Sequence, residues 1–122
     1  MKDNSAQQKR IAEMKFASVY PLYLAKIEKK GRTKDELDQV IEWLTGFNST
    51  QILNHINQKS SFELFFEEAN LHPNAVFIQG LICGYRVEEI DHLLTRKVRY
   101  LDKLVDELAK GRAMEKILRT GL

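Results

Sequence analysis

The stretch DHLLTRKVRYLDKLVDELAKG, residues 91–111, decides the fold class of this chain. Its apolar residues recur at spacings of four and three, which is the period of one face of an α-helix. These residues are Leu94, Val98, Leu101, Val105 and Leu108. Asp91 is a favoured N-cap residue and Gly111 a favoured stop, so we predict a long helix over residues 92–110.

The N-terminal part of the chain consists of a polar segment followed by a predicted helix. Residues 1–13 are polar and are expected to be frayed or weakly helical. A firm helix is expected after Ser18, with Pro21 in its first turn, where a missing N–H costs little, and with Gly31 as its end. Its buried stripe is expected to hold Val19, Leu22, Tyr23 and Ile27, with Tyr20 as a further candidate.

Three more helix starts follow along the chain. Thr33 and Glu36 form a capping box, and the helix that they begin is expected to stop at Gly46. Asn48 begins another helix by the same logic, and Ser60 with Glu63 is read as a further capping box. Each start is followed by apolar residues at helical spacing, so a succession of short helices is predicted.

Residues 75–87 are ambiguous between a strand and a helix. Their β-branched and aromatic content suits a strand. The helical period fits better, because Ile78, Leu81, Ile82 and Tyr85 follow the i, i+3, i+4, i+7 pattern. We therefore favour a buried helix, in which Gly80 and Gly84 stack on one face and Cys83 is a small core residue.

These patterns predict an all-α fold. A chain of 122 residues with 43% hydrophobic content can bury one core without disulfides or metals. We expect a compact, single-domain bundle of about five or six helices, with residues 14–122 as the helical domain and the long helix near the C-terminus.

The composition restricts where the protein is expected to be located and what it is expected to bind. No apolar stretch is long enough to span a membrane, the N-terminus lacks the apolar core of a signal peptide, and the single cysteine cannot form an internal disulfide. A cytoplasmic location without membrane association is therefore expected. The net charge of +2 is too balanced to indicate strong nucleic-acid binding.

Charge is nevertheless segregated along the chain. Residues 1–32 carry 8 basic and 3 acidic side chains, whereas residues 33–70 carry 2 basic and 7 acidic ones. The two regions can attract each other within one fold or between subunits. Together with the predicted face of Gly80 and Gly84, this motivates a homodimer hypothesis.

No sequence signature of catalysis is present. The histidines at 55, 72 and 92 lie outside any recognisable catalytic or zinc motif, and there is no phosphate-binding loop, dinucleotide fingerprint or EF-hand. The segment Arg86–His92 holds three carboxylates and an imidazole, which suits a divalent metal, but a solvated cluster with Asp91 as a cap is the simpler interpretation. We predict no catalytic residue, no metal and no cofactor, and we keep a small enzyme or metal site there as the third alternative.

The second alternative is a DNA-binding regulator. Residues 34–59 read as helix, turn and helix, and the second helix is rich in amide side chains that suit base edges. The first helix is acidic, which would repel phosphate. Nucleic-acid binding is therefore possible but not favoured over a non-enzymatic binding or protein-interaction module.

Seven residues offer hydrogen bonds or charges beyond the needs of a plain core. They are Tyr20, Tyr23, Arg32, Trp43, Arg86, Glu88 and Glu89. Arg86 would hold an anion, and Glu88 and Glu89 would take a cation or proton. These seven residues are the predicted ligand or partner site.

Several phrases in order resemble one family of small prokaryotic proteins, domain of unknown function 2200. They are FASVYPLY (16–23), KGRTK (30–34), IEWLTGF (41–47), CGYRVEEI (83–90) and RYLDKLVDELAKG (99–111). The resemblance runs from about Met14 to Arg119 and implies a single-domain cytoplasmic protein of a bacterium or archaeon, with no assigned activity. The family pattern has proline after the aspartate that is Asp91 here, whereas this chain has His92. That departure weakens any role for His92 as a required ligand.

Overall fold

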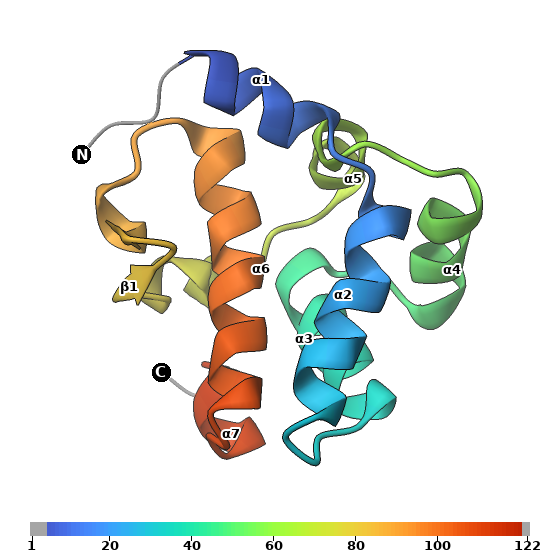
Figure 1. Cartoon of the computed structure of the whole chain (residues 1–122), viewed down its shortest axis with the longest axis vertical. Helices are drawn as coiled ribbons and strands as arrows, with labels where there is room; N and C mark the ends of the chain where they lie inside the picture. Colours follow the sequence, from blue (N-terminus) through green and yellow to red (C-terminus); the bar gives the residue numbers. More distant parts are fainter. Residues whose placement is uncertain (1–4, 121–122) are drawn as a thin grey trace.

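The computed structural model describes residues 5–120, which form a mostly helical domain around one central helix. That helix, α6 (Leu93–Ala109), runs through the middle of the molecule (Figure 1). The α2 helix (Phe16–Glu28) and the α3 helix (Lys34–Thr45) pack along it. The predicted all-α class and the long helix near the C-terminus are thus confirmed.

Shorter elements close the ends of α6. The α1 helix (Ser5–Glu13) crosses its N-terminal end beside α5 (Phe62–Glu68), and α7 (Met114–Ile117) folds back at its C-terminal end (Figure 1). The α4 helix (Ser49–Asn57) packs on α2 and α3. Among the described residues there are seven α-helices, because α1 and α7 form short helices of their own.

The long helix begins one residue later than predicted. Its N-cap is His92, whose Nδ1 accepts a hydrogen bond from the Thr95 backbone N–H at 3.3 Å. Asp91 is exposed and makes no cap, so the prediction of Asp91 as the N-cap is wrong. An imidazole nitrogen with a lone pair can satisfy a free helix N–H as a carboxylate oxygen would.

The α2 helix starts earlier than its sequence suggests. The Phe16 N–H donates to the Ser60 carbonyl at 2.9 Å, and the Phe62 N–H donates to the Met14 carbonyl at 2.8 Å. This pairing of two helix starts places Pro21 inside the helix rather than in its first turn. Leu22 is 68% exposed, so its predicted place in the buried stripe is wrong.

The helix starts at Thr33 and Asn48 are confirmed. Both are capping boxes, in which Glu36 and Gln51 return the hydrogen bond to the N-cap backbone N–H. The α5 helix differs, because Ser61 rather than Ser60 accepts from the Leu64 N–H. No capping box with Glu63 forms there, so that part of the prediction is wrong.

Residues 73–89 form an excursion from the helical pattern. It consists of the 3₁₀ helix η1 (Pro73–Phe77), the strands β1 (Leu81–Ile82) and β2 (Tyr85–Arg86), and the 3₁₀ helix η2 (Val87–Glu89). The strands pair antiparallel with Leu81 opposite Arg86 and Ile82 opposite Tyr85. The predicted buried helix over this segment is therefore wrong.

The tip of this hairpin explains the error. Cys83 and Gly84 have positive φ angles of 51° and 84°, which match a tight two-residue hairpin turn and cannot continue a right-handed helix. Cys83 is exposed, so it is not the predicted core residue. Only alternate residues such as Ile82 face the core, because a strand turns successive side chains to opposite sides.

Four phenylalanines gather in the core. Phe16 stacks on Phe65 with ring centroids 4.2 Å apart, and Phe62 and Phe66 surround the same site. Within residues 5–120, no helix is long and apolar enough to cross a membrane.

Candidate functional site

The most developed polar site lies where η1 meets the end of the chain. A cleft of about 680 Å³ opens between η1 and α7. Its lining residues are Phe77, Gln79, Arg112, Glu115, Lys116, Leu118 and Arg119. We call this region the C-terminal cleft. Its volume is within the range of pockets that bind ligands.

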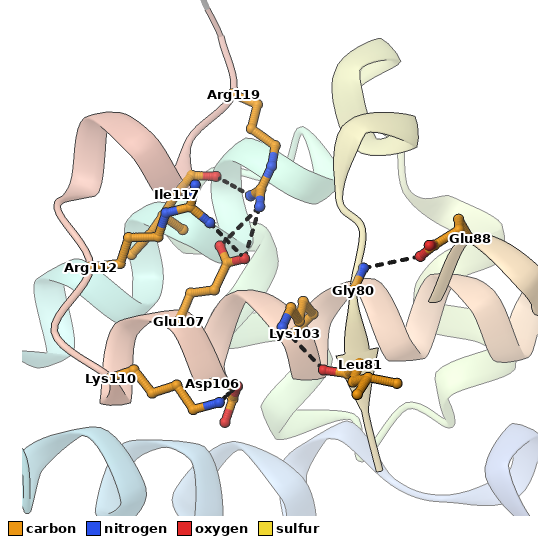
Figure 2. A network of polar contacts seen from close by, with 10 residues as sticks. All are labelled: Gly80, Leu81, Glu88, Lys103, Asp106, Glu107, Lys110, Arg112, Ile117 and Arg119. Atoms are coloured by element: carbon orange, nitrogen blue, oxygen red, sulfur yellow. Dashed lines mark hydrogen bonds and ion pairs between the residues drawn. The ribbon is translucent and has the colours of Figure 1, made fainter. Parts of the chain in front are cut away.

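A buried carboxylate, Glu107, holds two of the arginines that line the C-terminal cleft (Figure 2). Arg119 donates to both oxygens of Glu107, at 3.1 Å to Oε1 and 2.8 Å to Oε2. Arg112 donates to Oε2 at 3.0 Å. One carboxylate thus holds two guanidinium groups, and the paired set keeps one net positive charge. Both contacts of Arg119 with Glu107 come from Nη2, and its Nη1 donates to the Ile117 carbonyl at 2.7 Å, so the guanidinium is held by two of its nitrogens.

Three further side chains fasten the segment that carries these arginines. Arg32 pairs with Glu36 and also donates to the Arg112 carbonyl at 2.7 Å. Trp43 donates from Nε1 to the Thr120 hydroxyl at 2.8 Å, and Asn74 donates to the Arg119 carbonyl at 2.6 Å. The segment after α6 is therefore tied to α3 and to η1.

The C-terminal cleft combines positive charge with apolar surface. Arg112, Lys116 and Arg119 line it against a single acidic residue in the lining, Glu115. Phe77 is 47% exposed on one wall, and Val76 beside it is 59% exposed. This combination can receive an anionic group and an apolar side chain together.

The two predicted tyrosines are structural residues in separate networks. The Tyr20 hydroxyl donates to Asp38 Oδ1 at 2.5 Å, and the Tyr23 hydroxyl donates to Asp102 Oδ1 at 2.5 Å. Burial, and then the hydrogen bond that the hydroxyl donates to Asp38, raise the pKa of Tyr20 to about 12. Burial and the nearby Asp102 raise the pKa of Tyr23 well above its ordinary value. Both therefore stay protonated donors at neutral pH.

Two of the predicted residues of the hairpin region, Arg86 and Glu88, contact each other. Arg86 Nη1 is 3.7 Å from Glu88 Oε2, and the Gly80 N–H donates to Glu88 Oε1 at 3.0 Å (Figure 2). That backbone hydrogen bond is the main reason why the pKa of Glu88 is lowered. Glu89 is exposed. Glu88, which follows the hairpin, therefore ties η2 to Gly80 directly before β1.

The seven predicted residues do not form one network of contacts. Arg32 and Trp43 both donate hydrogen bonds to the C-terminal segment, to Arg112 and Thr120. Tyr20 and Tyr23 bind different aspartates. Sequence analysis missed Glu107, Arg112 and Arg119. The signal for Glu107 was its position between Val105 and Leu108, where a charge on the buried side of a helix needs a partner.

Two further features of the described residues bear on a metal site and on a catalytic site. Within residues 5–120, no group of three or more histidine, cysteine or carboxylate side chains could hold a metal ion. His55 lies between Ser60 (Nδ1 to Oγ, 2.7 Å) and Glu68 (Nε2 to Oε1, 3.2 Å), which resembles a catalytic triad. Ser60 is only 3% exposed, whereas Glu68 faces solvent. A nucleophile must meet its substrate, so this arrangement is structural.

Comparisons with known proteins agree on the family and assign no activity. A family described as "uncharacterized protein conserved in bacteria" (DUF2200) matches residues 10–119. The crystal structure of uncharacterized protein SP1917 superposes with a TM-score of 0.85 at 41% sequence identity, over 95% of each chain. No curated protein matches the chain. The match over almost the whole chain confirms the resemblance in the sequence, and the protein belongs to the DUF2200 family of bacterial proteins.

Proposed function

We propose that this protein is a non-enzymatic cytoplasmic binding module that takes an acidic, partly apolar segment of a protein partner in the C-terminal cleft. The observation that supports it is the pair of arginines held on buried Glu107 beside exposed Phe77.

The charge of the cleft favours an acidic partner. The Arg112 side chain is 44% exposed while its Nη1 is anchored on Glu107, so its remaining N–H groups face outward in a fixed orientation. Lys116 adds a second exposed cation. Because the Arg112 side chain is already held in place, it loses less side-chain entropy when it binds a carboxylate than a freely moving arginine would lose.

The apolar surface favours a segment of protein over a small metabolite. Phe77, Val76 and Leu81 are all about half exposed or more, and they continue from the cleft onto the hairpin. A small molecule in the cleft would leave most of this surface in water. Exposed apolar groups rimmed by polar residues mark interaction sites.

A second copy of this chain is one possible partner of this chemistry. The outer face of α5 presents Leu64, which is 38% exposed, between Glu63 and Glu67. Sedimentation velocity at low and high salt separates the two cases. Salt-sensitive dimers would identify a second copy as the occupant, whereas a monomer at high concentration would leave a different protein.

The helix-turn-helix interpretation has less support. The amide side chains Gln51, Asn54 and Gln58 on α4 share their face with the carboxylate of Glu68. A carboxylate among the base-reading groups opposes the approach of phosphate. The geometry therefore favours an acidic protein segment over DNA.

The test is fluorescence anisotropy with a short labelled peptide of glutamates interspersed with leucine and phenylalanine. The control peptide carries lysine in place of each glutamate. We expect binding of the acidic peptide only, weakened about tenfold by Arg112→Gln, in line with the loss of a charge-assisted hydrogen bond. Phe77→Ala should weaken it as well.

Lys29→Gln is the matched control, because Lys29 is exposed on the surface away from the cleft lining. It should leave peptide affinity unchanged. Equal affinity of both peptides, or an acidic peptide that binds Arg112→Gln as well as wild type, would contradict the proposal.

A further inference from the structure

A second cavity, which shares no lining residue with the C-terminal cleft, lies between α2, α3 and the start of α4. It measures about 290 Å³. Its lining residues are Tyr20, Lys34, Asp38, Ser49, Thr50, Ile52, Leu53 and Ile56. We call it the α2–α4 cavity. One side of it is polar and the other is apolar.

The polar side is a network of three residues from two helices. Asp38 accepts from the Tyr20 hydroxyl through Oδ1 at 2.5 Å and from Lys34 through Oδ2 at 2.7 Å. Both carboxylate oxygens are thus engaged, and the charge of Asp38 is matched by Lys34. An ammonium has three N–H donors, so Lys34 keeps donors for another acceptor. Asp38 thus holds the ammonium of Lys34, whose side chain lines the cavity and is 60% exposed.

Two hydroxyl groups lie on the same cavity. Ser49 and Thr50 are the first residues of α4 and are both exposed. Among residues 5–120, neither hydroxyl makes a side-chain hydrogen bond. They can therefore donate to a ligand that Lys34 also contacts. Asp38 is already paired with Lys34, so a cationic ligand would have to compete with that ammonium.

The opposite side is hydrocarbon. Ile52 is buried, Ile56 is half-buried, and Leu53 is 54% exposed at the mouth of the cavity. Burying a hydrocarbon chain against these residues is favourable, at about 25 cal/mol for each Å² removed from water. A ligand that satisfies both sides has one compact acceptor group and a short apolar tail.

We propose that the α2–α4 cavity binds a small monocarboxylate with a short hydrocarbon chain. Its carboxylate would accept from Lys34 and from the Ser49 and Thr50 hydroxyls. Its chain would lie on Leu53 and Ile56. A phosphate ester or a dicarboxylate fits less well, because a single lysine supplies the positive charge and one side of the cavity is apolar.

The experiment is an NMR titration of the ¹⁵N-labelled full chain with pentanoate and, separately, with pentanamide. The two probes share size and shape and differ in charge. We expect pentanoate to shift the amide signals of Ser49, Thr50 and Leu53 with saturation, and pentanamide to bind about tenfold more weakly, because hydrogen bonds to charged groups are the stronger ones.

Variants separate the two sides of the cavity. Lys34→Gln should weaken pentanoate about tenfold and remove the preference over pentanamide, whereas Leu53→Ser should weaken both probes. Lys30→Gln, an exposed lysine outside the lining, is the control and should change neither.

Three outcomes would overturn this inference. They are shifts that map outside the cavity, equal affinity for both probes, and unchanged pentanoate affinity in Lys34→Gln. Leu53 is largely exposed, so Leu53→Ser keeps the test valid if Lys34→Gln loses stability. Because the two sites share no residue, failure here leaves the peptide test of the C-terminal cleft unaffected.

Discussion

At the scale of the residue, Glu107 is the most consequential side chain in this protein. It is buried, and it is the shared partner of Arg112 and Arg119. Arg119 is 8% exposed in its side chain and also donates to the Ile117 carbonyl at 2.7 Å. Its position therefore depends on a carboxylate, because a buried guanidinium without a counter-charge is costly.

The first prediction follows from this dependence. Glu107→Gln keeps the shape of the side chain but leaves Arg119 buried without its counter-charge, so the free energy of unfolding should fall by about 3–5 kcal/mol. Urea denaturation monitored by circular dichroism measures it. Glu115→Gln, at an exposed position in the same cleft, should change stability by less than about 0.5 kcal/mol. Similar losses of stability in Glu107→Gln and Glu115→Gln would show that the pair of Glu107 and Arg119 does not stabilise the fold.

The buried tyrosines give a second prediction, on pH dependence. The pKa of Tyr20 rises from 10.0 to about 12 on folding, so the native state holds the phenolic proton more tightly than the unfolded state. Its contribution to stability is complete below pH 10 and is lost as pH rises toward 12. Tyr23 adds to the same trend.

Urea denaturation over this alkaline range checks the effect. The free energy of unfolding should decline with pH in wild type and decline less steeply in Tyr20→Phe. Tyr85→Phe, which removes a half-buried hydroxyl outside both networks, should keep the wild-type slope. An unchanged slope in Tyr20→Phe would exclude this tyrosine as a source of the pH dependence.

At the scale of the element, the start of α6 depends on an unusual cap. His92 Nδ1 lies 2.8 Å from the Thr95 hydroxyl and accepts from the Thr95 N–H. Asp91 is the more favoured cap type by statistics, yet it lies one position too early for the helix that forms. Packing of the long helix has therefore set its start.

The third prediction compares these two neighbours. His92→Ala should lower the free energy of unfolding by about 1 kcal/mol, because a free helix N–H loses its partner. His92→Asn should retain most of the stability, and Asp91→Ala should change it by less than about 0.5 kcal/mol. Thermal denaturation of the three variants is sufficient. A larger loss of stability in Asp91→Ala than in His92→Ala would show that Asp91 is the N-cap.

The hairpin and the end of α3 depend on left-handed residues, which gives a fourth prediction. Gly84→Ala meets no atom within 4 Å, so its cost is conformational alone, about 1–2 kcal/mol. Gly46→Ala should cost more, since its Cβ would also lie 3.1 Å from the Asn70 Cβ and 3.2 Å from the Asn70 carbonyl.

Urea denaturation measures the free energy of unfolding of the two glycine variants and shows which of them loses more. Cys83→Asn is the companion variant, because asparagine tolerates a left-handed backbone and should be neutral or stabilising at a φ of 51°. If Gly84→Ala cost as much as Gly46→Ala, steric contact would not be what separates the two positions.

At the scale of the whole molecule, the net charge is small, and acidic residues are paired locally with basic ones. The acidic residues of α3 are partly neutralised by pairs such as Arg32 with Glu36 and Lys34 with Asp38. The two glycines at 80 and 84 lie in a hairpin, so they no longer support a helix face for dimerisation. The segregation of charge remains as the basis of that hypothesis.

The fifth prediction concerns nucleic acid. Labelled random duplex DNA should show no steeply salt-dependent binding, because the amide side chains of α4 line a pocket together with Glu68 of α5, and no lysine or arginine lines that pocket. Fluorescence anisotropy at low and physiological salt measures this. Binding that weakens steeply with salt would instead favour a regulator that uses residues 34–59.

The sequence alone determined most of the helices and the nature of the core. The capping boxes at Thr33 and Asn48 and the apolar stripe of α6 were predicted correctly, because caps and helical faces depend on residues three or four positions apart. The family was also recognisable from the sequence, and the match over residues 10–119 confirms it.

Only the tertiary structure decided the hairpin and the candidate site. Residues 75–87 have a helical period, but left-handed residues at Cys83 and Gly84 turn the chain back, and packing against α6 selects that conformation. The C-terminal cleft joins Phe77 to Arg112 and Arg119, which are 35 or more positions away along the chain. Such contacts are set by how helices pack, and no local pattern of spacing or capping encodes them.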